Sequence, residues 1–237
     1  MKSVRGQRKT TAVPVVEIDF YGKRDIIVQD VHADSLATAT LLSSFQMAHA
    51  IPPSEVINVL QNVGISFVLV GAYGLGGWIQ KPRATEDVDV IVAAKHHKKA
   101  IKALLAAFAH LEAEDLPVVT RLRDRETQKV AIDVMKPNQQ LFREVFKHTH
   151  TVSSQGQTFR VPSLEMALAM KFAPMISLYR SDIDKHQDAH DFGRMVVSNS
   201  DIDLEKLAEL GDLVYPGGGK EIVEKVRQVR AGEKLIL

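Results

Sequence analysis

Hydrophobic and polar residues alternate along the chain in a pattern that predicts a mixed α/β protein. Short runs of β-branched residues predict strands, and longer runs whose apolar residues recur every three or four positions predict helices. Strands are expected at residues 65–71, 83–92, 116–122 and 129–135, and helices at residues 55–64, from residue 72 onward and at residues 96–110. The expected fold class is α/β (α+β), a small mixed β-sheet core flanked by helices.

The two ends of the chain differ from this core. Residues 13–30 predict a strand pair and residues 34–50 a helix, while Ser54 is placed to cap the helix that follows it. Ser163 caps a further helix, and the sequence beyond it has a helical pattern. The organisation expected is an N-terminal extension (1–53), a core (54–161) and a helical C-terminal region (162–237).

Two aspartates separated by a single valine lie in the run RATEDVDVIV, which otherwise has the composition of a buried strand. Residues i and i+2 of a strand lie on the same face, so Asp87 and Asp89 point to one side and Val88 and Val90 to the other. Neighbouring carboxylates repel each other and lose hydration unless a positive group offsets them. A hard divalent cation such as Mg²⁺, which takes oxygen ligands, is the usual partner.

A third carboxylate, Asp133, lies in the predicted strand KVAIDVMKP, on the opposite face from Ile132 and Val134. If this strand pairs with the one that carries Asp87 and Asp89, the three carboxylates meet at one edge. Three carboxylates can hold two divalent ions about 3.5–4 Å apart, which activates an attacking oxygen and stabilises a leaving pyrophosphate. The alternative is an ordinary strand-end residue paired with a surface lysine.

The run VGAYGLGGW predicts a strand that ends at Gly71 and turns directly into a helix. The first N–H groups of such a helix, around Gly71 and Ala72, have no partner within the helix and can bind phosphate. The glycines fit neither the dinucleotide-binding fingerprint nor the P-loop. The alternative is a tight turn with close helix packing.

Lys171 lies in a predicted helix that is apolar nearly all round. A lysine ammonium in such surroundings needs an anionic partner. That partner is either a phosphate of a ligand or the carboxylate of Asp188 in the next helix, and the two are compatible in different states of a reaction cycle.

These segments, in this order, resemble the polymerase-β-like nucleotidyltransferase superfamily, most closely its minimal branch with the AbiEii-type toxins of type IV toxin–antitoxin systems. The segments MALAMKFAPM and RSDIDKHQDAHDF extend the resemblance, which spans about residues 65 to 195. It implies the nucleotidyltransferase fold and catalytic, metal-binding roles for Asp87, Asp89 and Asp133. The nucleotide-binding residues that it implies are Gly71, Ala72, Arg83, Thr85, Lys171 and Asp188.

One position departs from the pattern of that family. Many members have Gly-Ser or Gly-Gly at the turn, whereas this chain has Gly71-Ala72. The serine hydroxyl is missing there, so either backbone amides suffice to hold a phosphate or nucleotide binding is weaker. This departure keeps open the alternative of a catalytically weak or inactive protein that acts as a binding module.

Composition limits the classes of ligand, of metal site and of cellular location that the sequence allows. Thirty Lys and Arg residues nearly balance 29 Asp and Glu residues, so overall charge argues neither for nor against nucleic acid. The lack of cysteine excludes disulfides, thiolate metal sites and cysteine nucleophiles. We see no signal peptide and no apolar run long enough for a membrane, so we expect no membrane partner and a cytoplasmic location.

Two further segments allow other ligands. His186 and His190 are four residues apart on a predicted helix, a spacing that can bind zinc, although the HExxH glutamate is missing. The basic run KHHKK at residues 95–99 offers contacts to RNA phosphates. A solvated basic helix face is the alternative for that run.

The function expected is a Mg²⁺-dependent (or Mn²⁺-dependent) nucleotidyltransferase that moves a nucleoside monophosphate from a nucleoside triphosphate to an acceptor hydroxyl. The acceptors considered are RNA such as tRNA, a protein or a small molecule, and an antitoxin is a further expected partner. A two-metal phosphohydrolase is the competing enzyme class, because it would use the same carboxylates without a triphosphate cradle.

Overall fold

A five-stranded mixed sheet forms the centre of the protein, whose computed structural model describes residues 51–80, 85–154 and 156–235. The strands lie in the order β1-β2-β5-β4-β3. β2 and β5 run parallel, and the other neighbours in the sheet run antiparallel. The bounds are β1 (Phe67–Leu69), β2 (Val88–Val92), β3 (Leu111–Asp115), β4 (Val119–Asp124) and β5 (Val130–Met135).

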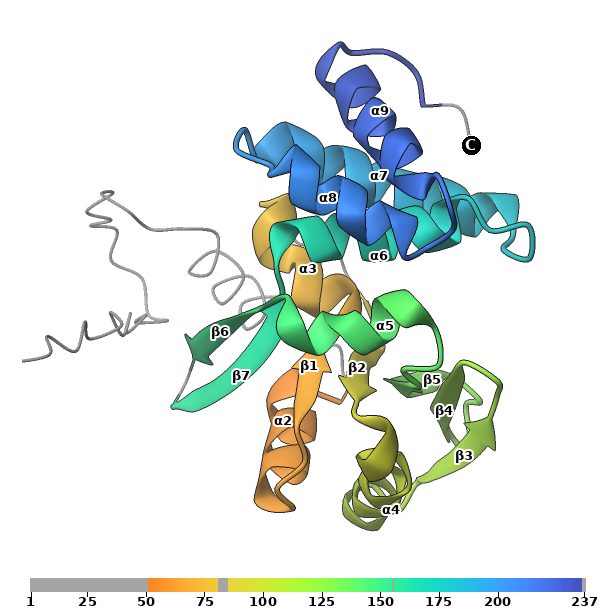
Figure 1. The fold of residues 1–237 in the computed structure, drawn as a ribbon. Helices are drawn as coiled ribbons and strands as arrows, with labels where there is room; N and C mark the ends of the chain where they lie inside the picture. The colour runs from red at the N-terminus through yellow and green to blue at the C-terminus, as the bar shows by residue number, and fades with distance from the viewer. Residues whose placement is uncertain (1–50, 81–84, 155, 236–237) are drawn as a thin grey trace, which may run out of the picture.

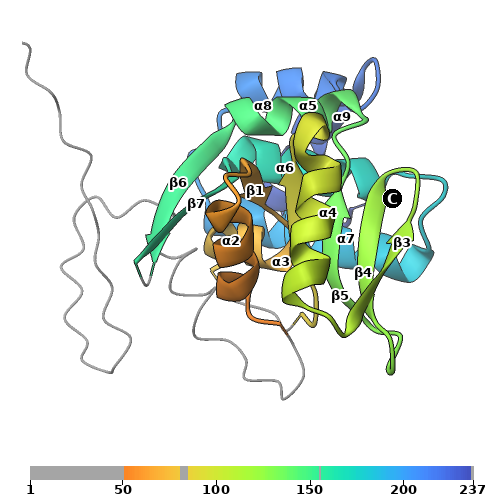
Figure 2. The same ribbon diagram turned by 90° about the horizontal axis from the view of Figure 1, so that it is seen from below.

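One face of the sheet is apolar and is covered by helices α2 (Pro53–Asn62) and α4 (His97–Ala107), which Figure 2 shows side by side in front of it. Alternate residues of β2 and β5, such as Val90 and Ile132, point into this core and are fully buried. The alternation confirms that Asp89 lies on the face opposite the valines of β2, whereas Asp87 lies just before β2 and not inside the strand expected at residues 83–92.

The other face of the sheet looks toward the remaining helices, and Val68 and Ile91 join it to their core. Figure 1 shows α6 to α9 gathered at one end of the molecule, with α3 between them and the sheet. These elements are α3 (Gly71–Ile79), α5 (Gln140–Glu144), α6 (Leu164–Met175), α7 (Asp182–Ser198), α8 (Leu204–Asp212) and α9 (Gly218–Arg230), with the hairpin β6 (Thr149–Ser154) and β7 (Gln157–Pro162) and the short 3₁₀ turns η1 (Ala94–His96) and η2 (Val145–Lys147).

The helical character beyond residue 162 is confirmed, because α6 to α9 follow one another there. Ser163 caps α6 as predicted, and its side chain accepts a hydrogen bond from the Met166 N–H at 3.4 Å. The domain boundaries stay a prediction. The strand pair and helix expected within residues 1–50 lie outside the described residues.

Three local predictions were wrong. α2 begins at Pro53, after Pro52 as its cap residue and with no side-chain cap, so Ser54 lies inside the helix. Proline suits that first position because its fixed φ is helical and its missing N–H would have no partner there. The helix expected to reach residue 110 ends at residue 107, and the strand expected from residue 116 starts at residue 119.

β3 was missed altogether, for a physical reason. It is an edge strand with the sequence LEAED, in which only Leu111 is buried. A strand that faces solvent on both sides shows no alternation of apolar and polar residues. β3 forms because it pairs with β4, and its local sequence does not reveal that pairing.

No helix within the described residues is both long enough and apolar enough to span a bilayer.

Gly74 offers a test of how closely α3 packs on β1. A Cβ built at Gly74 would lie 2.3 Å from the Leu69 carbonyl oxygen, so Gly74→Ala should force α3 away from the strand and cost about 1–3 kcal/mol. Gly193 is the matched control, because a Cβ there meets nothing within 4 Å and α7 should gain up to about 1 kcal/mol from Gly193→Ala. Urea unfolding measures both, and shifts of equal sign would contradict the packing argument.

Candidate active site

Three carboxylates converge on the face of the sheet that looks toward α6 and α7. Parallel pairing sets Asp89 of β2 directly beside Asp133 of β5, and Asp87 immediately precedes β2. One carboxylate oxygen from each of Asp87, Asp89 and Asp133 lies within 4.8 Å of the other two. The structure therefore brings together the three aspartates that the sequence pattern singled out.

Among the described residues, Thr85 and Arg121 offset part of the mutual repulsion of these carboxylates. Two unit charges 4.8 Å apart repel by about 3.5 kcal/mol at an effective dielectric constant of about 20. The Thr85 hydroxyl donates a hydrogen bond to Asp87, and the Arg121 Nε lies 3.6 Å from Asp133 Oδ1. Burial raises the pKa of Asp133 to about 6; Arg121 opposes that rise and Asp87 adds to it. Ionised together, the three carboxylates favour a positive charge close to them.

Gly71 opens α3 against this cluster. Its φ of +60° is in the left-handed region, and a Cβ built on it would lie 1.7 Å from Asp89 Oδ2, so only glycine fits. The Val70 N–H donates to the Asp89 carbonyl at 2.9 Å, and the first helical bond is donated by Gly74. The N–H groups of Gly71 and Ala72 thus have no partner inside α3 and lie at the helix end next to the carboxylates.

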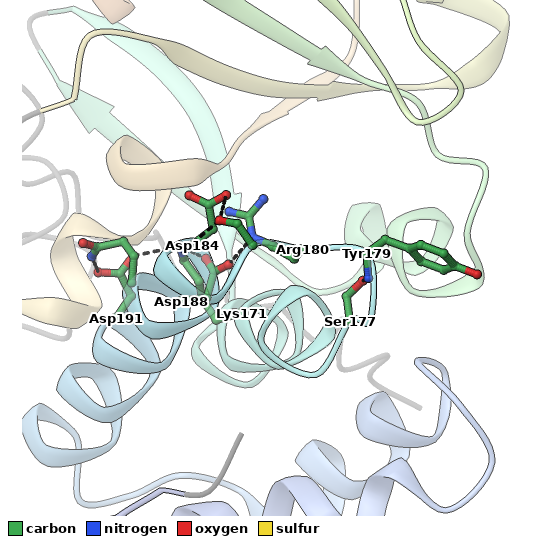
Figure 3. Close-up of polar contacts among 9 residues, drawn as sticks. Lys171, Ser177, Tyr179, Arg180, Asp184, Asp188 and Asp191 are labelled. Carbon is green, nitrogen blue, oxygen red and sulfur yellow. Dashed lines mark hydrogen bonds and ion pairs between the residues drawn. The ribbon is translucent and has the colours of Figure 1, made fainter.

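Across from the sheet, a buried ionic network joins α6 to α7. The Lys171 ammonium lies 2.9 Å from Asp188 Oδ1 and 2.7 Å from Asp191 Oδ2. The second oxygen of Asp188 accepts a hydrogen bond from the Arg180 Nε at 2.7 Å (Figure 3). Asp188 and Asp191 are 2% and 1% exposed, so the charges of this network are compensated locally.

A cleft of about 640 Å³ separates the carboxylates from this network. Val70, Leu75, Phe142 and Met170 contribute apolar walls. The ionisable residues that line it are Asp87, Asp89, Asp133, Asp184 and Asp188, with Arg121, Lys171 and Arg180.

Of the residues expected to bind a nucleotide, some line the cleft and others do not. Gly71, Thr85, Lys171 and Asp188 all line the cleft, whereas Ala72 is not among its lining residues. The ion pair expected between Lys171 and Asp188 is present. Arg83 lies outside the described residues.

Three charged residues of this region received no role from the sequence. Arg121 reaches Asp133 because antiparallel pairing of β4 and β5 sets them opposite each other, and no local pattern reveals that register. Arg180 lies in the connection between α6 and α7, where sequence periodicity is silent. Asp191 is the second aspartate of a D-x-x-D spacing, Asp188 to Asp191, that the family resemblance matched without giving Asp191 a separate role.

The carboxylates fit a divalent cation. All three are oxygen donors, the type that Mg²⁺ and Mn²⁺ prefer, and Asp133 Oδ1 is buried without a hydrogen-bond donor from the described residues. His186 and His190 are exposed on α7, and no third ligand residue joins them in the described part of the chain. The zinc alternative therefore has no support there.

The sequence matches one known family over most of its length. The model of the family described as "Nucleotidyl transferase AbiEii toxin, Type IV TA system" matches residues 58–234. The chain belongs to this family. The fold class and the resemblance to nucleotidyltransferases expected from the sequence are therefore confirmed.

Solved structures similar to this AbiEii-family protein include an antigenic nucleotidyltransferase-like protein from Paracoccidioides brasiliensis, the lincosamide antibiotic adenylyltransferase LnuA with lincomycin bound, and the antibiotic-resistance factor ANT(2'')-Ia. Their identities to the chain are 18%, 15% and 10%, with TM-scores of 0.47, 0.43 and 0.47. The matches cover 73%, 62% and 76% of this chain and 89%, 95% and 95% of theirs. No curated protein matches the sequence significantly.

The raised pKa of Asp133 gives this AbiEii-family protein a pH-dependent stability in the absence of metal. The carboxyl ionises near pH 4 in the unfolded chain and near pH 6 in the folded protein. The free energy of unfolding therefore decreases as the pH rises from 4 to 6, and above pH 6 the whole decrease is present. A rise of that size corresponds to about 3 kcal/mol. With a chelator present, Asp133→Asn should stabilise the protein at pH 8 by up to that amount and leave it unchanged at pH 4.

Chemical denaturation at both pH values measures this difference. Asp201→Asn serves as the control, because Asp201 is exposed and lies away from the cleft-lining residues. A stabilisation by Asp133→Asn that is equal at pH 4 and pH 8 would contradict the argument.

The ionic network predicts a large loss of stability for Lys171→Met. Removing the ammonium leaves Asp188 and Asp191 buried with one cation fewer, which should cost about 3–5 kcal/mol. Lys147→Met is the control, because Lys147 pairs with Glu144 at the surface and its loss should cost less than about 1 kcal/mol. Urea unfolding compares the two, and similar losses would mean that the buried pair behaves like a surface pair.

Proposed function

We propose that this protein is a Mg²⁺-dependent (or Mn²⁺-dependent) nucleotidyltransferase that transfers a nucleoside monophosphate from a nucleoside triphosphate to an acceptor hydroxyl. Pyrophosphate is the leaving group. One observation carries the proposal: Asp87, Asp89 and Asp133 converge in a cleft beside the glycine that opens α3. Membership of a nucleotidyl transferase family supports the same reaction class.

The charge of the cleft supports the need for a divalent cation. Among the described residues, five carboxylates and three cations line it, a formal excess of two negative charges. A triphosphate, itself strongly negative, would be repelled by such a cleft. Bound at Asp87, Asp89 and Asp133, one or two divalent cations would reverse that balance and neutralise charge on the reacting phosphate and the pyrophosphate.

The residues of the chain would divide the remaining work. Asp133, adjacent to both other carboxylates, would accept the proton from the acceptor hydroxyl. The Gly71 N–H, at the cleft, would bind a phosphate oxygen through the backbone, which needs no serine at the turn, and the Ala72 N–H would assist only if the phosphate reaches beyond the residues that line the cleft. Thr85 holds Asp87 in place by its hydrogen bond. Arg83 is assigned to the phosphates by resemblance alone.

On the opposite wall, Lys171 and Asp188 complete the proposed nucleotide site. Because two carboxylates already compensate the charge of Lys171, its ammonium would attract the phosphates of the bound nucleotide only weakly before the reaction begins. Its contribution grows as charge develops on the triphosphate during transfer. The ion pair and the phosphate contact are therefore compatible.

For the acceptor and the biological role, the proposal follows what is expected of the family and names classes of molecule only. An RNA such as tRNA, a protein or a small molecule can supply the hydroxyl, and an antitoxin is the partner expected of a type IV toxin. The absence of a serine at Ala72 is the observation that favours a non-catalytic binding module as a second candidate.

A labelling experiment with Asp89→Asn tests the proposal. Wild-type protein incubated with each α-³²P-labelled nucleoside triphosphate, Mg²⁺ and total cellular RNA should transfer label to an acceptor and release unlabelled pyrophosphate. Asp89→Asn should reduce transfer by at least about 10²-fold, because a ligand of the cation that stabilises the phosphate charge is lost. Its stability should be unchanged or slightly higher, because a repulsion is removed.

Three outcomes separate the alternatives. Labelled monophosphate or diphosphate without any labelled acceptor would indicate a phosphohydrolase, and the absence of any reaction with RNA, protein extract or small-molecule acceptors would favour the binding module. Asp201→Asn, an exposed aspartate changed in the same way, should retain full transfer. A strong loss of stability in Asp89→Asn would instead point to a structural ion pair.

A further inference from the structure

Arg180 is one of the cleft-lining residues to which the sequence gave no role. It lies in the connection between α6 and α7 and lines the same cleft as the three carboxylates, on the opposite wall. Its side chain is 42% exposed, compared with 11% for Lys171. Arg180 therefore offers a solvent-accessible positive charge in a cleft that has a negative excess.

The guanidinium is anchored at one nitrogen only. Its Nε donates to Asp188 Oδ2 at 2.7 Å, and Asp188 itself is buried and held by Lys171 (Figure 3). The two terminal nitrogens of Arg180 make no hydrogen bond to any described residue. A buried carboxylate thus orients the fork of the guanidinium while leaving four N–H groups available.

The other cations of the cleft are engaged differently. Two of the three Lys171 donors are directed at Asp188 and Asp191. Arg121 lies on β4, where its Nε faces Asp133 at 3.6 Å. Arg180 is the cleft-lining cation of the described residues that is both opposite the carboxylates and anchored through a single donor.

We propose that Arg180 binds the outer phosphates of the nucleoside triphosphate, the part that leaves as pyrophosphate, and so distinguishes triphosphates from monophosphates. The proposal rests on the proposed function, which places the reacting phosphate at Asp87, Asp89 and Asp133. A triphosphate tail that extends from there across the cleft meets the wall that carries Arg180.

The chemistry of the side chain fits this ligand. A guanidinium presents two parallel N–H groups that match two phosphate oxygens, and its hydrogen bonds to anions are about twice as strong as neutral ones. The adjacent Tyr179 is fully exposed and points away from Arg180 in Figure 3, so it does not share this ligand. Asp184, which also lines the cleft, accepts a hydrogen bond from the Ser181 hydroxyl at 2.8 Å.

Nucleotide binding without turnover tests the proposal. Titration calorimetry with Mg²⁺ would compare the α,β-methylene analogue of each nucleoside triphosphate with the monophosphate of the same base. Arg180→Gln should weaken binding of the triphosphate analogue about 10- to 100-fold, the loss typical of hydrogen bonds to a charged group, and leave the monophosphate affinity unchanged. Arg180→Lys should recover little, because one ammonium cannot hold Asp188 and a phosphate with the same geometry.

Arg143→Gln is the matched control, because Arg143 is exposed on α5 and does not line the cleft. It removes the same charge and should bind both ligands like the wild type. Equal affinities of Arg180→Gln and wild type, or equal losses for triphosphate and monophosphate, would overturn the assignment while leaving the proposed function intact. A wild type that binds no nucleotide would overturn the proposed function and this assignment with it.

Discussion

Parallel pairing of β2 with β5 places Asp89 directly beside Asp133, and the remaining features of the site depend on that register. A slip of one residue would turn Asp133 toward α2 and α4 and bury a carboxylate in an apolar core. The register is held by the opposite face, where Val88, Val90 and Ile132 are fully buried. Hydrophobic packing on one side of the sheet therefore sets the positions of the charges on the other side.

The same closeness of like charges explains the residues around them. Gly71 is required because any side chain would occupy the position of the Asp89 carboxylate, and Thr85 and Arg121 each reach one of the other two aspartates. Burial raises the pKa of Asp133 to about 6 in spite of the nearby Arg121. A cluster of three carboxylates that faces a cleft and includes one with a raised pKa is suited to binding a cation.

The C-terminal helices α6 and α7, with their connection, provide positively charged groups on the side of the cleft opposite the sheet. Lys171 and Arg180 share Asp188, so one buried carboxylate positions two cations on the wall opposite the sheet. Asp191 supplies the second negative charge and lets the lysine stay buried. The network joins α6 to α7 and presents positive charge to the cleft, so a structural role and the proposed ligand-binding role fall on the same residues.

By itself, the sequence determined the type of most described elements and the identity of the three aspartates, because strand alternation and the spacing of Asp87 and Asp89 are local properties. Only the tertiary structure decided which strand pairs with which, and hence that Arg121 reaches Asp133. It also revealed β3, whose exposed residues carry no pattern, and the place of Arg180 opposite the carboxylates. Contacts between distant segments depend on register and packing, and these arise only when the whole chain buries its apolar surface.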